Sequence, residues 1–509
     1  MKELEKTKSI CPECFKEDKM NKIDARIIEE DGKIWITKEC PRHGSFKDIV
    51  SNDAALYHRW SRYKVTGDGV ENTEIKSWLS PENQLYPKHR SQTVLTNVML
   101  TNRCNLRCGY CFMNAGAAGY IYEPSLEQLR KIMRQVREEK PVPSKAIQLT
   151  GGEPTIRDDL FEIIKMAKEL GFTHVQLNTN GIKLANSLDY CKKIKDSGVS
   201  TIYLSFDGVS KENNPWIEQN KKAVENLRKA GITSIILVPV VMKRNINELA
   251  GIVKYAIENV DVVRGVNFQP IAFTGRTQNV SGEHVKKERV DYVDAINALE
   301  KGLDGQLNKG DFYPVSFVYP ISKIVENLTG KKQVEFTAHP SCGGATYVFI
   351  ENGRIIPITR FVDVEGLMEF INKQSKKSGA FKKPRIILSF LMNVSKYIDK
   401  EKSPKGFNLA KLLIKTATGG SYGALKEFQY KTLYIGSMWF QDIWNLNIDR
   451  LERCVIHYAT LDGVIPFCAY NSLGVGEKIR KKYSISFEEW KDKTGKTIDD
   501  DLWKGAKAV

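Results

Sequence analysis

Nine of the ten cysteines in this chain fall into three groups of three, and cysteine sulfur is the preferred ligand of iron–sulfur clusters and of zinc. The middle group lies within one octapeptide, CNLRCGYC, which supplies Cys104, Cys108 and Cys111. Three thiolates on a short loop suit a four-iron cluster with one iron left open to a small chelating molecule. The alternative is a structural zinc loop, but closed zinc sites use four protein ligands. Cys191 stands alone and is expected to be a core or surface thiol.

The first group lies near the N-terminus. Cys11 and Cys14 form a CxxC pair, and after 25 intervening residues Cys40 and His43 form a CxxH pair. This spacing is typical of a tetrahedral mononuclear site of the zinc-ribbon or rubredoxin type, and both zinc and iron accept these ligands. The site either stabilises a small domain with little core or transfers electrons, and basic zinc ribbons also bind nucleic acid.

The third group is scattered over the C-terminal part and consists of Cys342, Cys454 and Cys468. Glycine, proline or histidine stands within three residues of each of them, which favours an auxiliary iron–sulfur cluster completed by His339, His457 or a bound ligand. The alternative is a set of three buried thiols in the core, because free cysteine is among the most buried residue types.

The octapeptide directly follows the first of six apolar runs that are separated by amphipathic stretches such as 125–139 and 159–171. This alternation predicts parallel strands joined by helices, in an α/β fold of the partial (β/α)6 barrel type. Barrel enzymes place their chemistry at the carboxyl ends of the strands, which is where the octapeptide lies. The predicted strands are 93–101, 146–150, 174–180, 201–206, 234–240 and 264–270.

The rest of the chain divides around this barrel. Residues 1–65 alternate in short segments with a hairpin around Asp31, which predicts a rubredoxin-like or zinc-ribbon domain. Residues 66–92 are polar and rich in turn formers, as in a linker. The barrel is expected over 93–275, and residues 276–509 are expected to form a C-terminal α+β domain with the auxiliary cluster.

The pattern CxxxCxxC with an aromatic residue before the last cysteine resembles the signature of the radical S-adenosylmethionine (SAM) superfamily. Further similarities to that superfamily follow at the strand ends: GGEP (151–154), NTNG (178–181), LSFDG (204–208) and NFQP (267–270). Taken singly, these motifs are ordinary turns and helix caps. Their register with the cysteine loop makes the resemblance specific over residues 93–275.

This resemblance implies that Cys104, Cys108 and Cys111 hold a [4Fe–4S] cluster whose open iron chelates SAM. A low-potential donor of the ferredoxin or flavodoxin type would reduce the cluster, and the resulting 5′-deoxyadenosyl radical would abstract hydrogen from an unactivated alkyl carbon. By the same resemblance, GGE binds the methionine amino group, and the other strand ends contact the ribose, carboxylate and adenine. The SAM contacts implied in this way are Tyr110, Gly151, Gly152, Glu153, Pro154, Asn178, Asn180, Ser205, Asp207 and Gln269.

Segments outside the barrel core, such as 339–349 and 453–471, are similar to the archaeal tetraether lipid synthase group, which has also been described as pterin methyltransferases. This similarity implies carbon–carbon coupling between the alkyl chains of archaeal membrane lipids. The pattern of that group includes another cysteine-rich motif before the barrel, whereas the corresponding stretch here, 80–89, has no cysteine. One auxiliary cluster fewer is therefore expected. If that cluster takes part in the coupling reaction, this protein would act on a different lipid, form a different bond or catalyse another reaction.

Composition limits the cellular setting. The 509 residues carry a formal charge of +16, contain no apolar run that could span a bilayer and begin without a secretory signal, which predicts a cytoplasmic protein. Basic residues over 376–385 precede the apolar run 386–392, which indicates either peripheral contact with the inner membrane surface or a core helix beside a basic loop. The charge also suits RNA, but no RNA-binding module is recognisable, so no nucleic acid is expected.

We therefore expect a radical SAM oxidoreductase or transferase that forms carbon–carbon bonds between lipid chains. A long apolar groove between the barrel mouth and the C-terminal domain would admit the alkyl chains. One alternative is radical methylation of a pterin or a lipid, which would consume a second SAM and yield S-adenosylhomocysteine. A second alternative is a non-enzymatic iron–sulfur or zinc protein that binds nucleic acid, which would leave the strand-end motifs unexplained.

Overall fold

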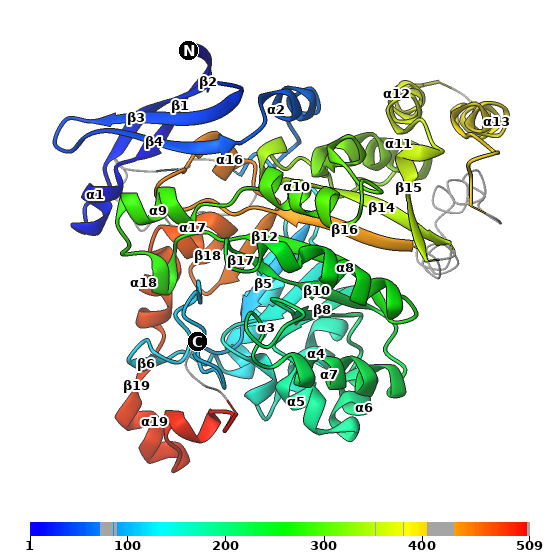
Figure 1. Ribbon diagram of the computed structural model, residues 1–509. Coiled ribbons are helices and arrows are strands. Elements are labelled where there is room, and N and C mark those ends of the chain that lie inside the picture. Colours follow the sequence, from blue (N-terminus) through cyan, green and yellow to red (C-terminus); the bar gives the residue numbers. More distant parts are fainter. Residues whose placement is uncertain (72–84, 86–88, 352, 380, 405–431, 506–509) are drawn as a thin grey trace.

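The N-terminal part of the computed structural model is a four-stranded antiparallel sheet with the order β1–β2–β3–β4 (Figure 1). A tight turn with positive φ at Asp31 and Gly32 joins β2 to β3, so the predicted hairpin is confirmed. The described residues are 1–71, 85, 89–351, 353–379, 381–404 and 432–505. Elements of this part are β1 (Lys2–Ile10), α1 (Pro12–Lys16), β2 (Lys22–Glu30), β3 (Lys33–Cys40), β4 (Gly44–Ser51) and α2 (Ala54–Ser61).

The six predicted barrel strands are all present and lie side by side as parallel neighbours, so the predicted fold class is confirmed. Their order is β5–β7–β8–β9–β10–β12. The strands are β5 (Leu95–Met99), β7 (Ala146–Thr150), β8 (His174–Thr179), β9 (Thr201–Ser205), β10 (Ile235–Val238) and β12 (Val263–Pro270), and the short β11 (Val240–Val241) pairs with β12. The connecting helices are α3 (Leu126–Arg137), α4 (Leu160–Glu169), α5 (Ile182–Asn186), α6 (Leu188–Ser197), α7 (Ile217–Lys229) and α8 (Leu249–Glu258).

The barrel sheet continues past the predicted boundary at residue 275. Strand β16 (Thr432–Met438) pairs in parallel with β12, and β17 (Ile456–Thr460) pairs in parallel with β5. The outer strands are β13 (Tyr313–Pro314), β14 (Gly343–Glu351), β15 (Arg354–Pro357) and β18 (Gly463–Pro466). The segment 276–509 therefore contributes strands to both edges of the barrel as well as helices outside it, and the predicted linker over 66–92 lies largely outside the described residues.

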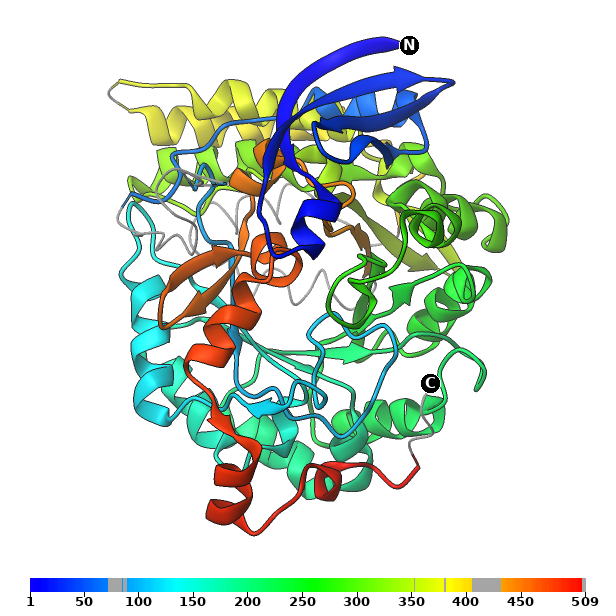
Figure 2. The ribbon, with the colours of Figure 1, turned by 90° about the vertical axis from the view of Figure 1, so that its left-hand side faces the viewer.

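Helices of the C-terminal segment lie above the barrel (green to yellow in Figure 2), and those nearest the end of the chain lie beside and below it (red). They are α9 (Gly282–Glu288), α10 (Tyr292–Gly302), α11 (Tyr319–Thr329), α12 (Val364–Ser375), α13 (Lys382–Asn393), α16 (Ile448–Glu452), α17 (Phe467–Ser472), α18 (Val475–Lys482) and α19 (Phe487–Thr494). A last small sheet joins β6 (Tyr120–Ile121) to β19 (Ile485–Ser486), so the end of the chain packs beside the loop that follows the cysteine octapeptide.

The barrel helices form because their apolar residues recur at helical spacing. In α3 the buried side chains are Leu129, Ile132, Met133 and Val136, which lie on one face and pack into the main core. Ser125 caps the start of this helix, because its hydroxyl oxygen accepts a hydrogen bond from the Gln128 backbone N–H. The Gln128 side-chain oxygen accepts a hydrogen bond from the Ser125 backbone N–H in return. Burial of such faces against the outer side of the sheet supplies most of the stability of the barrel.

A buried arginine connects three parts of the chain. Arg289, just after α9, donates to Asp442 at 2.6 Å and to Asp48 of β4 at 2.5 Å. All three side chains are less than 10% exposed. The N-terminal sheet, the segment after the barrel and the loop after β16 therefore share one ion triad in a low-dielectric setting.

Replacing this arginine is expected to destabilise the protein strongly. Arg289→Met leaves two buried carboxylates without their cation, and such a change costs about 3–5 kcal/mol of unfolding free energy. Urea unfolding followed by circular dichroism would measure the loss. The control is Arg228→Met, which breaks the surface pair with Asp261 and should cost less than about 1 kcal/mol. Equal losses in the two variants would contradict a structural role for the triad.

Candidate active site and metal centres

The two glycines of GGEP lie against the backbone that leads into the cysteine octapeptide. Gly152 N–H donates to the Thr101 carbonyl at 2.7 Å, and Glu153 N–H donates to the Arg103 carbonyl at 2.9 Å. A β-carbon on Gly151 would lie 2.4 Å from the Thr101 oxygen, and one on Gly152 would lie 2.0 Å from the Arg103 oxygen. Only glycine fits at either position, and the contact fixes the start of the cysteine loop against the end of β7.

Glu153 is the centre of a buried network between strand ends. Its carboxylate accepts the hydroxyls of Thr155 at 2.6 Å and Thr179 at 2.7 Å, and the Asn180 backbone N–H at 2.8 Å. Burial raises the pKa of Glu153, and these donors oppose the increase. The Asn180 side chain in turn donates to the Asn105 side chain at 2.6 Å, so the network extends into the cysteine loop.

The three thiols of the octapeptide are grouped closely enough to affect one another. Burial raises the pKa of Cys108 to about 12, and the charge of Cys111 contributes to the increase. Burial also raises the pKa of Cys104, as do the other two thiolates. Arg276 donates to the carbonyl oxygens of Cys108 at 2.6 Å and Ala115 at 2.5 Å, and thereby closes the loop around the thiols. This donor set fits a cluster held by three cysteines.

Tyr110 ties the cysteine loop to the next strand ends. Its hydroxyl donates to Asp207 at 2.5 Å, and the other oxygen of Asp207 accepts the Val240 N–H at 2.7 Å. Burial raises the pKa of Asp207, against the effect of these two donors. The Arg244 guanidinium lies 5.4 Å from the centre of the Tyr110 ring, within cation–π range. Asp207 therefore positions Tyr110 in this structure.

The remaining predicted SAM contacts lie along the same edge of the sheet. The Asn178 amide on β8 donates to the Thr150 hydroxyl at 3.2 Å. Pro154 begins a short 3-10 turn after β7, and Ser205 is the last residue of β9. Gln269, on β12, lines a pocket next to Tyr110. The structure thus brings all the predicted contact residues to the carboxyl ends of the strands, and their contacts with SAM stay a prediction.

The pocket beside Tyr110 is mostly apolar and small. It has a volume of about 40 Å³, and its walls include Phe112, Phe440, Phe467 and Cys468. Phe440 and Phe467 stack with their ring centres 4.0 Å apart. Sites for drug-sized ligands measure about 300–1,000 Å³, so this space is much smaller than the long groove that alkyl chains would need. It lies where that groove was expected, between the barrel mouth and the C-terminal segment.

The third cysteine group comes together where the two edges of the barrel approach each other. Gln441, just after β16, donates its N–H to Cys468 Sγ at 3.4 Å, and Arg450 Nε donates to Cys342 Sγ at 3.3 Å. Burial raises the pKa of Cys468 to about 11, against the nearby charge of Arg450. Burial also raises the pKa of Cys454, and the thiolates of Cys468 and Cys342 add to that effect. Three converging thiols fit the auxiliary cluster predicted here, which stays a prediction.

Both histidines suggested as a fourth ligand use their Nδ1 atoms for contacts with other residues in this structure. His457 Nδ1 lies 2.7 Å from the Thr93 hydroxyl, which also donates to Glu139 at 2.9 Å. His339 Nδ1 accepts the N–H of Ser341, and its Nε2 lies 3.9 Å from Asp449. Among the described residues, the charged group nearest to the thiols is instead Arg450, which compensates thiolate charge.

The N-terminal group forms a compact site. His43 Nδ1 lies 3.5, 3.4 and 3.8 Å from the sulfurs of Cys11, Cys14 and Cys40, and all four ligand atoms lie within 4.8 Å of one another. Tetrahedral zinc bound at about 2.3 Å needs sulfurs roughly 3.8 Å apart, and Cys14 and Cys40 match this spacing at 3.8 Å. Although burial opposes it, backbone N–H groups lower the pKa of Cys40 to about 6. The other ring nitrogen of His43 lies 3.2 Å from Glu17, as in many metal sites.

Three supporting residues are absent from the predictions made from sequence. Arg276 stands in the segment FTGR just after the sixth strand, and only the fold shows that it reaches back to the cysteine loop. Arg450 lies 108 residues from Cys342, so no local pattern connects the two. Glu17 stands three residues after Cys14, and an acidic residue so close to a CxxC pair could have been noted as a partner for the histidine.

The N-terminal site is expected to hold one metal ion. Cys14→Ser removes one of four ligands and should lower the content of that metal from one per chain to near zero, without loss of iron from the other centres. Elemental analysis by mass spectrometry measures this directly. Cys191→Ser is the matched control, because Cys191 is buried and lies outside all three groups. An unchanged metal content in Cys14→Ser would contradict the assignment.

The third group is expected to hold iron. The triple variant C342A/C454A/C468A should lose about four iron atoms per chain after anaerobic reconstitution, and the cluster signal of the octapeptide should persist. Iron analysis and electron paramagnetic resonance of the reduced protein provide the two measurements. If the variant keeps its full iron content, the three residues are core thiols.

Comparisons with known proteins agree with this geometry. Residues 98–256 match the radical SAM superfamily, and residues 3–52 match a domain described as the HMPTM N-terminal zinc ribbon domain. Both matches fall on parts of the chain whose fold and cysteine spacing point to the same assignment.

Full-length similarity extends beyond these domains. The 7,8-dihydro-6-hydroxymethylpterin dimethyltransferase of Methanocaldococcus jannaschii is 45% identical and is matched over 96% of this chain and 97% of its own length. The GTP 3′,8-cyclase of Clostridium perfringens is 30% identical over 38% of this chain and 62% of its own. The crystal structure of methylornithine synthase superposes with a TM-score of 0.33 and 12% identity, over 42% of this chain and 64% of its own. The chain therefore belongs to the radical SAM superfamily and, over nearly its whole length, to the family of the archaeal dimethyltransferase.

Proposed function

We propose that this protein is a radical SAM methyltransferase of a dihydropterin, with 7,8-dihydro-6-hydroxymethylpterin as the first substrate to test. The observation that carries the proposal is the full-length relative of that name, which is 45% identical and matches both the barrel and the segments around it. The pocket beside Tyr110 adds support, because Phe112, Phe440 and Phe467 line it and aromatic rings stack on a planar ring system such as a pterin.

Each part of the proposed site has a role that its contacts support. Cys104, Cys108 and Cys111 would hold the [4Fe–4S] cluster, which together with SAM supplies a 5′-deoxyadenosyl radical. Glu153 holds the ends of β7 and β8 together, and Asp207 holds Tyr110 over the loop. The phenylalanines of the neighbouring pocket keep water away from the reacting carbon.

The proposed reaction replaces one substrate hydrogen with a methyl group. One SAM accepts an electron and becomes methionine and 5′-deoxyadenosine, and the latter carries the hydrogen removed from the substrate. A second SAM donates its methyl group and becomes S-adenosylhomocysteine. A second electron completes the balance, so a reduced donor protein must supply two electrons for each methyl group added.

The first experiment is an anaerobic product count. The reconstituted and reduced protein is mixed with SAM and 7,8-dihydro-6-hydroxymethylpterin, and mass spectrometry measures methylated pterin, 5′-deoxyadenosine and S-adenosylhomocysteine. We expect the three products to rise in equal amounts. Cys108→Ala should abolish all of them, and Cys191→Ala should leave them unchanged. Cleavage of SAM without methylated pterin would contradict the substrate proposed here.

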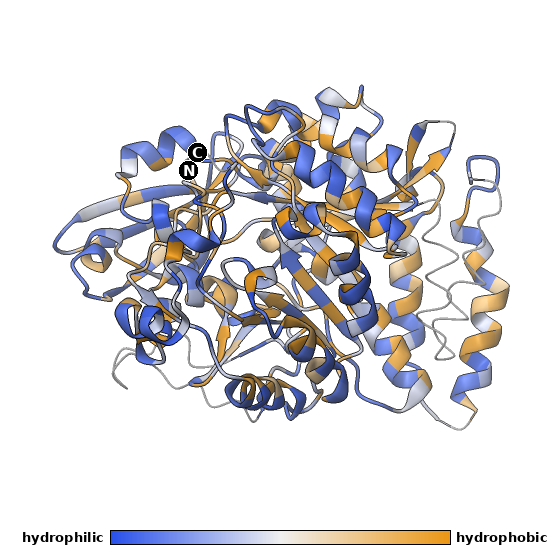
Figure 3. Ribbon diagram, turned by 90° about the horizontal axis from the view of Figure 1, so that it is seen from below, coloured by the Kyte–Doolittle hydropathy of each residue, from blue (hydrophilic) through white to orange (hydrophobic). Residues whose placement is uncertain are grey.

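Coupling of lipid alkyl chains, the first expectation from the sequence, is the second candidate, and one observation favours it. Helix α13 lies at the edge of the molecule (Figures 1 and 3). Large apolar side chains are exposed on this helix and at the residue just before it. These are Phe381 at 80%, Leu388 at 57%, Leu391 at 56% and Met392 at 65% exposure. Lys382, Lys383 and Arg385 stand at the start of the same helix. Basic residues beside an exposed apolar face are typical of contact with an anionic lipid surface.

The sequence has another apolar run after α13, FNLAKLLIK (407–415), which also bears on a membrane contact. It lies outside the described residues. Within the described residues, no helix combines the length and the apolar character that crossing a membrane requires. Archaeal diether phospholipids in place of the pterin distinguish the two candidates. Lipid products that have lost hydrogen, with 5′-deoxyadenosine but without S-adenosylhomocysteine, would establish coupling and exclude methylation.

A further inference from the structure

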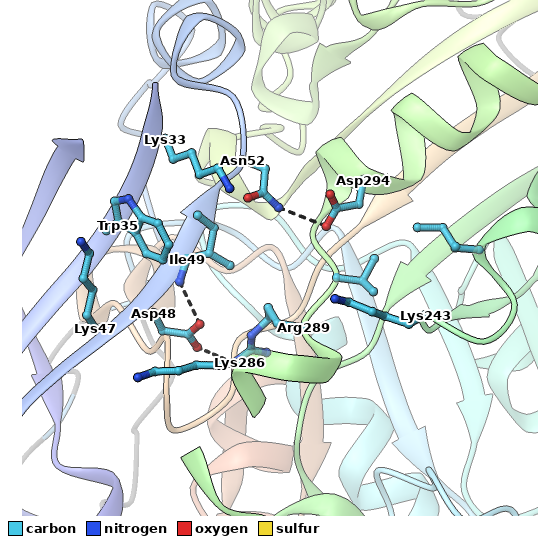
Figure 4. A pocket seen from close by; sticks show the side chains of 12 residues that line it. Lys33, Trp35, Lys47, Asp48, Ile49, Asn52, Lys243, Lys286, Arg289 and Asp294 are labelled. Atoms are coloured by element: carbon cyan, nitrogen blue, oxygen red, sulfur yellow. Dashed lines mark hydrogen bonds and ion pairs between the residues drawn. The ribbon is translucent and has the colours of Figure 1, made fainter. Parts of the chain in front are cut away.

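A second and larger cleft lies between the N-terminal sheet and the barrel (Figure 4). It has a volume of about 780 Å³, within the range of about 300–1,000 Å³ that small-molecule sites occupy. None of the residues assigned above to the cysteine groups or to SAM lines it. The lining residues are Lys33, Trp35, Lys47, Asp48, Ile49, Asn52, Lys243, Ile246, Lys286, Arg289, Val290 and Asp294.

Four lysines from distant parts of the sequence converge on this cleft. Lys33 and Lys47 come from β3 and β4, Lys243 follows β11, and Lys286 belongs to α9. Lys47 pairs with Glu30. Within the part of the chain that the structure describes, Lys33, Lys243 and Lys286 form no ion pair with a carboxylate. Three unneutralised ammonium groups around one hollow produce a strongly positive potential there.

The two acidic residues of the cleft already have partners. Asp48 accepts from Arg289 and from the Ile49 backbone N–H. Asp294 accepts from the Asn52 side chain at 3.1 Å and from the Asp291 backbone N–H at 3.0 Å. Asp48 is thus neutralised by Arg289, and Asp294 is held by neutral donors without an ion pair to Lys33, Lys243 or Lys286. The positive charges of the cleft still outnumber the negative ones, which favours an anion from outside.

The wall between the lysines is apolar. It consists of Trp35, Ile49, Ile246 and Val290. Lys47 Nζ lies over the Trp35 ring, 4.5 Å from the ring centre. A free phosphate ion would leave this wall and most of the 780 Å³ unused. We propose that the cleft binds an organic phosphate, whose phosphate charges meet Lys33, Lys243 and Lys286 and whose organic part covers the apolar wall.

The cleft borders the candidate active site without belonging to it. Lys243 precedes Arg244, which lies over Tyr110 of the cysteine loop. Arg289 donates to Asp442, which also accepts the N–H of Phe273 just beyond β12. The proposed phosphate site thus has its own residues and can be tested independently of any SAM reaction.

Isothermal titration calorimetry of the full protein tests the proposal, with pyrophosphate and ADP as soluble probes. The triple variant K33Q/K243Q/K286Q should bind them at least tenfold more weakly than the unchanged protein. Increasing the salt concentration should weaken binding to the unchanged protein and have much less effect on the variant. All three lysines are exposed, so the variant should keep the melting temperature and the metal content of the parent.

The matched control removes the same charge elsewhere. K165Q/K193Q/K254Q changes three exposed lysines on the barrel helices α4, α6 and α8 and should keep the parent affinity within twofold. Equal weakening in the two triple variants would show an effect of net charge alone and would overturn the site. Failure of the unchanged protein to bind pyrophosphate, ADP and phosphatidylglycerol vesicles alike would also overturn it.

A lipid arm identifies the source of the phosphate. Vesicles that contain phosphatidylglycerol are compared with vesicles of phosphatidylcholine, using the same three proteins in a sedimentation assay. Binding of ADP and pyrophosphate assigns the cleft to a soluble organic phosphate. Loss of phosphatidylglycerol binding in the cleft variant alone, with no affinity for the soluble probes, assigns it to a lipid headgroup. Both results support the phosphate chemistry, whereas binding that ignores the cleft lysines contradicts it.

Discussion

The backbone contact between residues 151–153 and residues 101–103 determines the rest of the site. Two glycines allow the end of β7 to approach the cysteine loop so closely that peptide groups bond directly across the gap. Because Glu153 is held by this contact, its carboxylate can collect donors from the end of β8. The Asn180 amide then returns to the cysteine loop at Asn105. A larger side chain at either glycine would separate the loop from the strand ends that position it.

The same principle of closing a loop with long-range contacts appears at the other centres. Arg276 holds the cysteine loop from beyond the sixth strand, and Arg450 reaches Cys342 from the far edge of the barrel. Arg289 joins the N-terminal sheet to the loop after β16 through two buried carboxylates. Guanidinium groups suit these positions, since one side chain can satisfy several acceptors and stays charged when buried. Part of the positive charge of the chain is thus structural.

Local patterns explain why much of the fold could be predicted from the sequence. Six apolar runs at regular spacing indicated the barrel strands β5, β7, β8, β9, β10 and β12. Asp31 with Gly32 indicated the turn from β2 to β3. The continuation of the sheet through β16 and β17 could not be found in this way, because each joins the barrel through a strand more than 160 residues away. Cysteine spacing indicated the N-terminal site, since its two knuckles are local. Arg450 and the cleft of lysines depend on contacts between distant segments, which no local pattern records.

An aromatic wall lines the pocket at the barrel mouth. Phe440 and Phe467 stack at 4.0 Å, and Phe467 also packs against Phe112 of the cysteine loop at 6.0 Å. Helix α17, which carries Phe467, is fixed by the stacking of Tyr470 on Tyr458 at 3.9 Å. The other ring of the stacked pair, Phe440, lies in the loop after β16 and is not part of this helix. A stacked pair contributes about 0.5–1.5 kcal/mol beyond its buried area. Under the proposed function, a flat pterin ring that took the place of Phe440 against Phe467 would regain this contribution. Under the second candidate function, an alkyl chain in the same place would bury apolar area but would not regain the stacking contribution.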